Sequence, residues 1–147
     1  MSDCATRDVP STQLATDLAN NTLPAFSFIT PNVISDMHDG TIQQGDTWLS
    51  TDLRAILNSP EYKSGTTAVF LTWDEGEGGT SNNCATNTTD VSCHVATIVV
   101  SPSTIPGTQA ATLFNHYSLL GTAEELLSLP KLGLATSFPT MTSAFNL

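Results

Sequence analysis

The sequence LTWDEGEGG (residues 71–79) places acids and glycines directly after the apolar run TTAVFLTW (66–73). Asp74 and Glu75 are therefore adjacent carboxylates at the point where a buried strand is predicted to end. Two carboxylates about 4 Å apart repel each other by roughly 4 kcal/mol at an effective dielectric constant of 20. Solvent, a shared proton or a bound cation would offset this repulsion, and the function depends on which of them does.

Apolar runs predict three strands, at residues 25–30, 67–73 and 95–101. The second and third runs are nearly continuous in β-branched and apolar residues, which is typical of strands covered on both faces in a parallel sheet. Segments with a helical spacing of apolar residues lie between and after them. This alternation predicts one domain over residues 1–147, with an α/β fold and a mainly parallel sheet.

A short helix is predicted at residues 13–19, and a longer one carries apolar residues along one face from 49 to 57. Gly45 and Asp46 offer a start and an N-cap for the longer helix. Pro60 is expected to end it, because proline does not continue a helix.

The last helical pattern is opened by NHYS (115–118) and stopped by Pro130. Its leucines and alanine repeat at the spacing of one helix face. The tail after Gly133 is weakly patterned, so we expect it to be irregular.

Fourteen acidic and four basic residues give the chain a net charge of −10. Such a surface does not bind nucleic acid through its phosphates, although it suits cations or simply high solubility. No apolar run approaches the ~20 residues that a transmembrane helix needs. The N-terminal residues MSDCATRDVP lack the basic and apolar regions of a signal peptide.

Cys84 and Cys93 bracket the polar loop CATNTTDVSC. This spacing predicts a disulfide, which would stabilise the fold by about 2.5–3 kcal/mol on the chain-entropy estimate. A structural zinc site is a poorer interpretation, because two cysteines and one histidine leave it incomplete. Cys4 is left over, and in an oxidising environment an odd cysteine indicates a missing partner.

Polar residues follow each predicted strand, and ligands of open parallel sheets bind beyond the carboxyl ends of the strands. The side chains expected to meet at that edge are Asp36, His38, Asp39, Asp74, Glu75 and His116. Carboxylates with neutral imidazoles suit a divalent cation, which would also offset the repulsion of the acid pair. Ordinary structural roles remain open: turn residues for the first acids, a solvated loop for the acid pair and a cap or packing contact for the last histidine.

Two other kinds of site fit the sequence badly. The G-x-S-x-G turn of many serine hydrolases does not occur. The segment DEGEGGTSNNCA lacks the alternating oxygen ligands and closing glutamate of an EF-hand calcium loop.

The motifs PAFSFITPN, SDMHDG, GDTWL, SPEYKSGTTAVFLTWDEG, VVSP and NHYSLL follow one another between about Cys4 and Gly133. Together they resemble the phosphoesterase family of bacterial and fungal acid phosphatases and phospholipases C, in the alkaline phosphatase superfamily. The resemblance implies an α/β/α sandwich and hydrolysis of phosphoric esters, either phosphomonoesters or phospholipids. It also implies a secreted or periplasmic protein.

The same resemblance implies roles for individual residues. Asp74 and Glu75 match a paired acidic motif at the metal and phosphate centre, as catalytic and metal-binding residues. His38 matches an active-site histidine, with Asp36 as a metal ligand beside it. His116 lies in the histidine motif that opens the last core helix, also as a ligand of a divalent metal ion. Gly121 stands where family members commonly carry an arginine.

In the family, an N-terminal half supplies an acid–Asn pair for the metal, the nucleophilic Ser or Thr and several strands. None of these is found in this sequence, so the resemblance implies the C-terminal portion of a larger phosphoesterase domain. We therefore expect the chain to need that half, or a partner chain, and to be weakly active or inactive alone. The alternative is an acidic secreted module that binds cations, or is purely structural, without catalysis.

Overall fold

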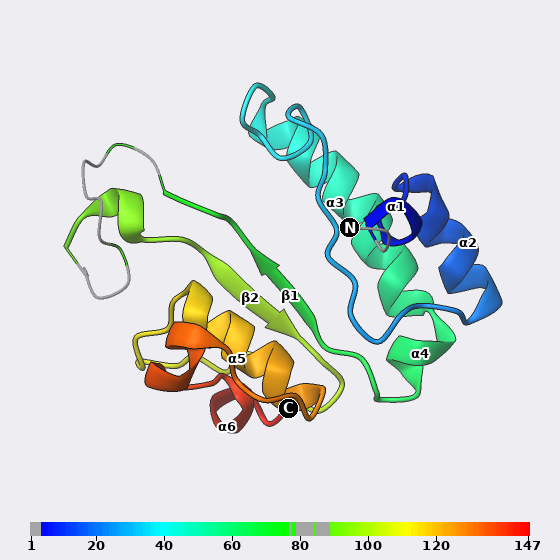
Figure 1. Cartoon of the computed structure of the whole chain (residues 1–147). Helices are drawn as coiled ribbons and strands as arrows, with labels where there is room; N and C mark the ends of the chain where they lie inside the picture. Colours follow the sequence, from blue (N-terminus) through cyan, green and yellow to red (C-terminus); the bar gives the residue numbers. More distant parts are fainter. Residues whose placement is uncertain (1–3, 77, 79–83, 85–88) are drawn as a thin grey trace. The chain divides into compact units, whose positions relative to one another are not determined.

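The computed structural model describes residues 4–76, 78, 84 and 89–147 (Figure 1). They form two compact units, Met1–Thr66 and Thr67–Leu147, and each is described by itself. Both helices and strands are present, which confirms the α/β class. Within the described part of the chain, no helix has the length and apolar character needed to cross a membrane.

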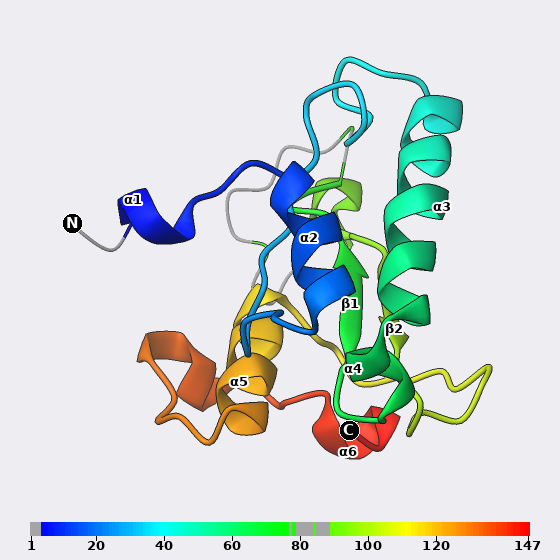
Figure 2. The ribbon, with the colours of Figure 1, turned by 90° about the vertical axis from the view of Figure 1, so that its right-hand side faces the viewer.

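The first unit is helical, with α2 and α3 side by side (Figure 2). Among the residues of this unit that the structure describes, the buried apolar ones are Leu18 and Ile56, one from each of these helices. The elements of this unit are α1 (Cys4–Arg7), α2 (Thr12–Asn20), α3 (Ile42–Asn58) and α4 (Pro60–Lys63). The expected helix at 13–19 is confirmed by α2.

The long helix α3 begins earlier than the sequence predicted. Its N-cap is Thr41, whose hydroxyl accepts a hydrogen bond from the backbone N–H of Gln44, while the Gln44 side chain accepts one from the N–H of Thr41. This reciprocal capping box satisfies backbone donors at the helix start. The prediction of Asp46 as N-cap is therefore wrong. Gly45 lies inside α3, where the Met37 side chain occupies the space that a Cβ would take.

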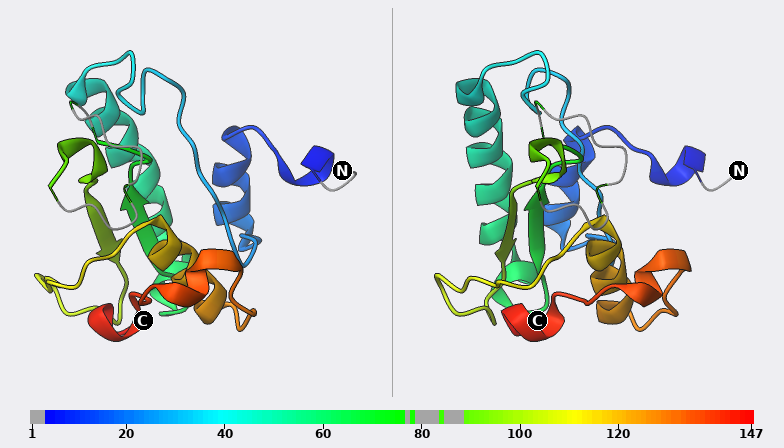
Figure 3. Two further views of the ribbon diagram at one scale, coloured as in Figure 1. Left: turned by 60° about the vertical axis from the view of Figure 1, so that its left-hand side comes forward. Right: turned by 90° about the vertical axis from the view of Figure 1, so that its left-hand side faces the viewer.

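The second unit carries the sheet, which Figure 3 shows from two sides. Its elements are β1 (Val69–Thr72), the 3-10 helix η1 (Val91–Cys93), β2 (Thr97–Val100), α5 (His116–Leu126), the 3-10 helix η2 (Gly133–Ser137) and α6 (Thr142–Phe145). Two of the three predicted strands are thus present, in shortened form. The segment 25–30, predicted as the third, contains no strand, and its Phe28 is 83% exposed.

The strands pair in antiparallel fashion, with Val69 opposite Val100 and Thr72 opposite Thr97. The predicted parallel arrangement of these two strands is therefore wrong. A continuous apolar run indicates burial but not strand direction. Direction depends on the connection, and a parallel pair needs a crossover. Between β1 and β2 the described residues contain only the short helix η1.

The C-terminal segment is ordered against α5, which corrects the expectation of an irregular tail. Helix η2 packs on α5 (Figure 1), and Ala135 and Met141 are buried. The buried Thr122 hydroxyl of α5 donates to the Ser118 carbonyl and accepts a hydrogen bond from the Met141 N–H. The core of this unit therefore lies between the last long helix and the tail that follows it.

Candidate active site

The acid pair Asp74–Glu75 lies just beyond the carboxyl end of β1, as the sequence predicted. Both residues are exposed, so water screens their mutual repulsion. The protein can therefore fold with no cation bound to these two carboxylates. An exposed pair at a strand end is also accessible to a ligand.

The strand side of the acid pair is held by the β1–β2 ladder. Thr72, the last residue of β1, donates its hydroxyl to the Ala96 carbonyl at 3.2 Å. Its Oγ1 also lies 2.9 Å from the Oγ1 of Thr97 on the opposite strand. These contacts join the two strands at the end nearest the acids.

The other side of the acid pair is held by Gly76. Its N–H donates to the Ser92 carbonyl at 2.9 Å. A Cβ on Gly76 would lie 2.5 Å from the Val91 carbonyl oxygen and 2.9 Å from that of His94. Only glycine allows this approach, because a side chain at that position would collide with backbone atoms. The glycines after the acids are evident in the sequence, but this backbone contact leaves no signal there that could predict it.

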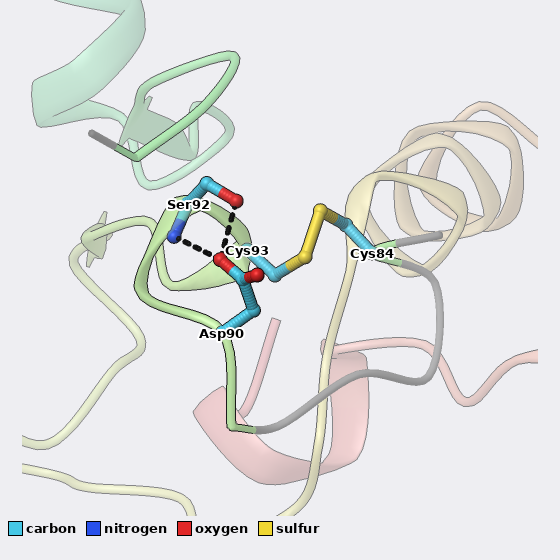
Figure 4. Close-up of a disulfide and its surroundings, with 4 residues drawn as sticks. All are labelled: Cys84, Asp90, Ser92 and Cys93. Carbon is cyan, nitrogen blue, oxygen red and sulfur yellow. Dashed lines mark hydrogen bonds between the residues drawn. A yellow bond between two sulfur atoms is a disulfide. The ribbon is translucent and has the colours of Figure 1, made fainter. Parts of the chain in front are cut away.

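Cys93 of η1 forms the predicted disulfide with Cys84, with a Cα–Cα separation of 4.8 Å (Figure 4). The N-cap of η1 is Asp90, whose Oδ1 accepts hydrogen bonds from the N–H and the hydroxyl of Ser92. Cys4 has an exposed free thiol in this structure.

His116 contacts the backbone just before the acid pair. Its Nε2 lies 2.9 Å from the carbonyl oxygen of Trp73, the residue before Asp74. A carbonyl oxygen only accepts, so Nε2 carries the hydrogen and donates it. In a neutral imidazole this leaves the lone pair on Nδ1. Histidines that ligate metals commonly donate their other ring N–H to a backbone carbonyl or carboxylate in this way.

Helix α5 sets the position of His116, which is its first residue. The side chain of the N-cap Asn115 accepts a hydrogen bond from the Ser118 N–H, and the Ser118 hydroxyl accepts one from the Asn115 N–H. Farther along the helix, Gly121 is buried, and a Cβ there would lie 3.3 Å from the Ala135 carbonyl oxygen. The tail thus occupies the space where the family resemblance leads us to expect an arginine.

Asp36 and His38 belong to the first unit and are described within it. The Oδ1 of Asp36 accepts a hydrogen bond from the His38 N–H at 2.8 Å, which is the turn role of aspartate. Met37 between them has φ = 76°, and Gly40 approaches the Ile34 carbonyl too closely for any Cβ. This turn leaves the His38 side chain exposed. The predicted meeting of these residues with the acid pair and His116 stays a prediction.

The donor set of the second unit suits a divalent cation chemically, because it offers carboxylates and an oriented imidazole. The residues that the structure describes contain no group of three or more His, Cys, Asp or Glu side chains that could hold a metal ion. These residues therefore suit a divalent cation in the type of ligand atom that they offer and in the orientation of His116. The proposed metal ligands stay a prediction.

The sequence profile of the phosphoesterase family matches residues 2–130. The chain belongs to the phosphoesterase family. This confirms the family resemblance and places the segment 131–147, which packs on α5 through η2, outside the matched region.

Curated relatives of this phosphoesterase family chain carry phosphatase names. A phosphatidylinositol-3-phosphatase of Mycobacterium tuberculosis is 38% identical over 84% of this chain and 37% of its own length. A probable acid phosphatase of Kluyveromyces lactis is 38% identical over 80% of this chain and 26% of its own. An acid phosphatase of Aspergillus fumigatus is 32% identical over 83% of this chain and 26% of its own length.

The chain thus spans between about a quarter and somewhat over a third of the length of these relatives. No solved structure matches it significantly.

Proposed function

We propose that this chain carries part of the active site of a phosphoric ester hydrolase. The observation that carries the proposal is the hydrogen bond from His116 to the carbonyl of Trp73. It holds an imidazole on the backbone of the residue that precedes the exposed acid pair Asp74–Glu75, in a chain that belongs to the phosphoesterase family. The acid phosphatase and phosphatidylinositol-3-phosphatase relatives support phosphoric esters as the substrate class.

In this proposal Asp74, Glu75 and His116 hold a divalent cation, and the family resemblance adds Asp36 to the set. When bound, such a cation would polarise a phosphoryl oxygen and stabilise the negative charge on the phosphoryl oxygens. The carboxylates supply anionic oxygens that are open to solvent. His116 offers Nδ1, because its Nε2–H is engaged by the Trp73 carbonyl. His38 is assigned to the phosphoryl oxygen on the family resemblance.

The nucleophilic Ser or Thr is assigned to a part of the family domain that this chain does not span. The complete domain is proposed to be an α/β/α sandwich of the alkaline phosphatase type. Its parallel strands would then come from that other part, because the two described strands are antiparallel. Phe26 and Phe28 are 57% and 83% exposed, respectively. Their exposure supports contact with that other part of the domain, since apolar side chains of this size are stabilised when another surface covers them.

A secreted or periplasmic location is proposed on the Cys84–Cys93 disulfide, because disulfides persist in oxidising environments. The substrate is proposed to be either a small phosphomonoester or a phospholipid; one relative is named as a phosphatidylinositol-3-phosphatase and another as a probable acid phosphatase. A phospholipase C activity would instead hydrolyse the glycerol–phosphate ester of the phosphodiester in a phospholipid, and it is a narrower version of the same proposal.

The role of the acid pair is tested by titrating the chain with Mn²⁺, Mg²⁺, Ca²⁺ or Zn²⁺ in a calorimeter. Asp74→Asn should weaken binding of the cation by about 10-fold or more. Asp46→Asn, at an exposed position of α3, removes the same charge and should leave binding within about twofold. Equal affinity of Asp74→Asn and wild type would contradict the assignment.

Catalysis is tested with p-nitrophenyl phosphate and the cation that binds. Turnover should be weak or absent with the chain alone and should appear when it is joined to the N-terminal part of a phosphoesterase family relative. Robust metal-dependent turnover by the chain alone would contradict the assignment of the nucleophile to a part of the domain that this chain does not span. Cation binding without turnover in the joined protein would instead support a module that binds cations without catalysis.

A further inference from the structure

The backbone on both sides of the acid pair is fixed, but by different elements. On the strand side, Thr72 is paired with Thr97 in the β1–β2 ladder. On the other side, Gly76 is bonded to Ser92 of η1. Only residues 73–75 lie between these two fixed points, so the direction of the two carboxylates depends on both.

The contact of Gly76 depends on the conformation of the η1 segment, residues 90–94. Gly76 approaches the carbonyl oxygens of Val91 and His94 more closely than any residue with a Cβ could. Its N–H reaches the Ser92 carbonyl only if these carbonyls keep their directions. Gly76 therefore packs directly against the backbone of the η1 segment.

The η1 segment is itself held at two points (Figure 4). Asp90 caps it through hydrogen bonds to the N–H of Ser92 at 2.9 Å and to its hydroxyl at 2.6 Å. The disulfide to Cys84 ties Cys93 to a position nine residues earlier in the chain. Removing either restraint frees carbonyls that Gly76 contacts.

We propose that the η1 segment, held by Asp90 and by the Cys84–Cys93 disulfide, positions Asp74 and Glu75 for their ligand through Gly76. Asp90 and Gly76 are then positioning residues, and neither contacts the ligand. The inference rests on the proposed function, because the acid pair has a ligand only if that function holds. It adds a reason for the disulfide beyond stability: breaking it loosens one end of the acid segment and leaves the strand end in place.

The first test measures geometry and needs no ligand. Amide hydrogen exchange at Gly76 is followed by NMR in the whole chain. Asp90→Ala and the double variant Cys84→Ser/Cys93→Ser should each speed this exchange by about 10-fold, the equivalent of one lost backbone hydrogen bond. Asp90→Asn keeps an Oδ1 acceptor and should restore slow exchange. Asp46→Ala and Cys4→Ser are matched controls and should exchange as wild type.

The second test measures Mn²⁺ affinity of the same variants by calorimetry. Asp90→Ala, Gly76→Ala and the double cysteine variant should weaken binding by about 10-fold, as loss of an outer-shell contact does, and Asp90→Asn should restore it. Circular dichroism checks that each variant is folded. If exchange quickens while Mn²⁺ affinity is unchanged, the positioning role is overturned. If no variant, wild type included, binds Mn²⁺, Mg²⁺, Ca²⁺ or Zn²⁺ yet exchange responds as expected, the assignment of a cation to the acid pair fails and the support of Gly76 stands.

Discussion

The Nε2 atom of His116 lies 2.9 Å from the carbonyl oxygen of Trp73, so the first residue of α5 is bonded to the backbone just before the acid pair. Replacing His116 by alanine removes both this bond and the Nδ1 lone pair. We expect Mn²⁺ affinity to fall by about 10-fold or more in calorimetric titration. Gln109→Ala changes an exposed polar side chain of the same unit outside the η1 segment and should stay within about twofold of wild type. Equal losses in both variants would remove His116 from the site.

The buried Gly121 lets the tail approach α5, because a Cβ there would lie 3.3 Å from the Ala135 carbonyl oxygen. Gly121→Arg should therefore lower the free energy of unfolding by about 1–3 kcal/mol, as overpacking of a core does. Urea denaturation of the whole chain measures the change. Leu120→Arg, at a 42% exposed position of the same helix, should change stability by less than about 0.5 kcal/mol. A Gly121→Arg protein as stable as wild type would show that the tail yields easily.

Glu125 connects α5 to the tail and responds to pH. The hydrogen bond from the Thr142 hydroxyl, with smaller effects of Thr140 and Lys131, lowers the pKa of Glu125 below its ordinary value of 4.5. A lowered pKa in the folded state means that the stabilisation is present above 4.5 and is lost as the pH falls through the folded-state value. When the midpoint of thermal unfolding is measured from neutral to acidic pH, it should therefore fall less steeply at the acid end for Glu125→Gln than for wild type. Thr142→Val should reduce the slope in the same direction, and a slope unchanged by either variant would contradict this origin.

The capping box of α3 distinguishes its true N-cap from the position that the sequence favoured. Thr41→Ala removes the acceptor for the Gln44 N–H and should cost about 1 kcal/mol of stability in thermal or urea unfolding. Asp46→Ala lies one turn inside the helix on an exposed face and should change stability by less than about 0.5 kcal/mol. The reverse order of effects would favour Asp46 as the effective helix start.

Local patterns predicted the helices better than the strands. Apolar spacing and Pro130 placed α5, and the short pattern at 13–19 placed α2, because a helix satisfies its hydrogen bonds within one segment. The tail was underestimated, since η2 is stabilised by packing on Gly121 and not by a periodic face of its own. The segment 25–30 has the apolar composition of a strand, yet a strand needs a neighbour, and none pairs with it in the described residues.

Some features of the candidate site could be predicted from the sequence, and others could not. Residue type and order alone placed Asp74 and Glu75 at a strand end and predicted the Cys84–Cys93 disulfide. The sequence could not show that the Trp73 carbonyl orients His116, because backbone acceptors carry no signature in residue identity.

The amino-acid sequence by itself determined the family of this chain, the acid pair after an apolar strand and the positions of its main helices, because these depend on residue identity and on spacing over a few turns. Only the tertiary structure decided the antiparallel direction of β1 and β2, the seat of Gly76 on η1 and the contact of His116 with Trp73. Each of these joins segments far apart in the chain. Such contacts form only when the connecting segments bring the partners together, and the free energy of that closure is not written in any local pattern.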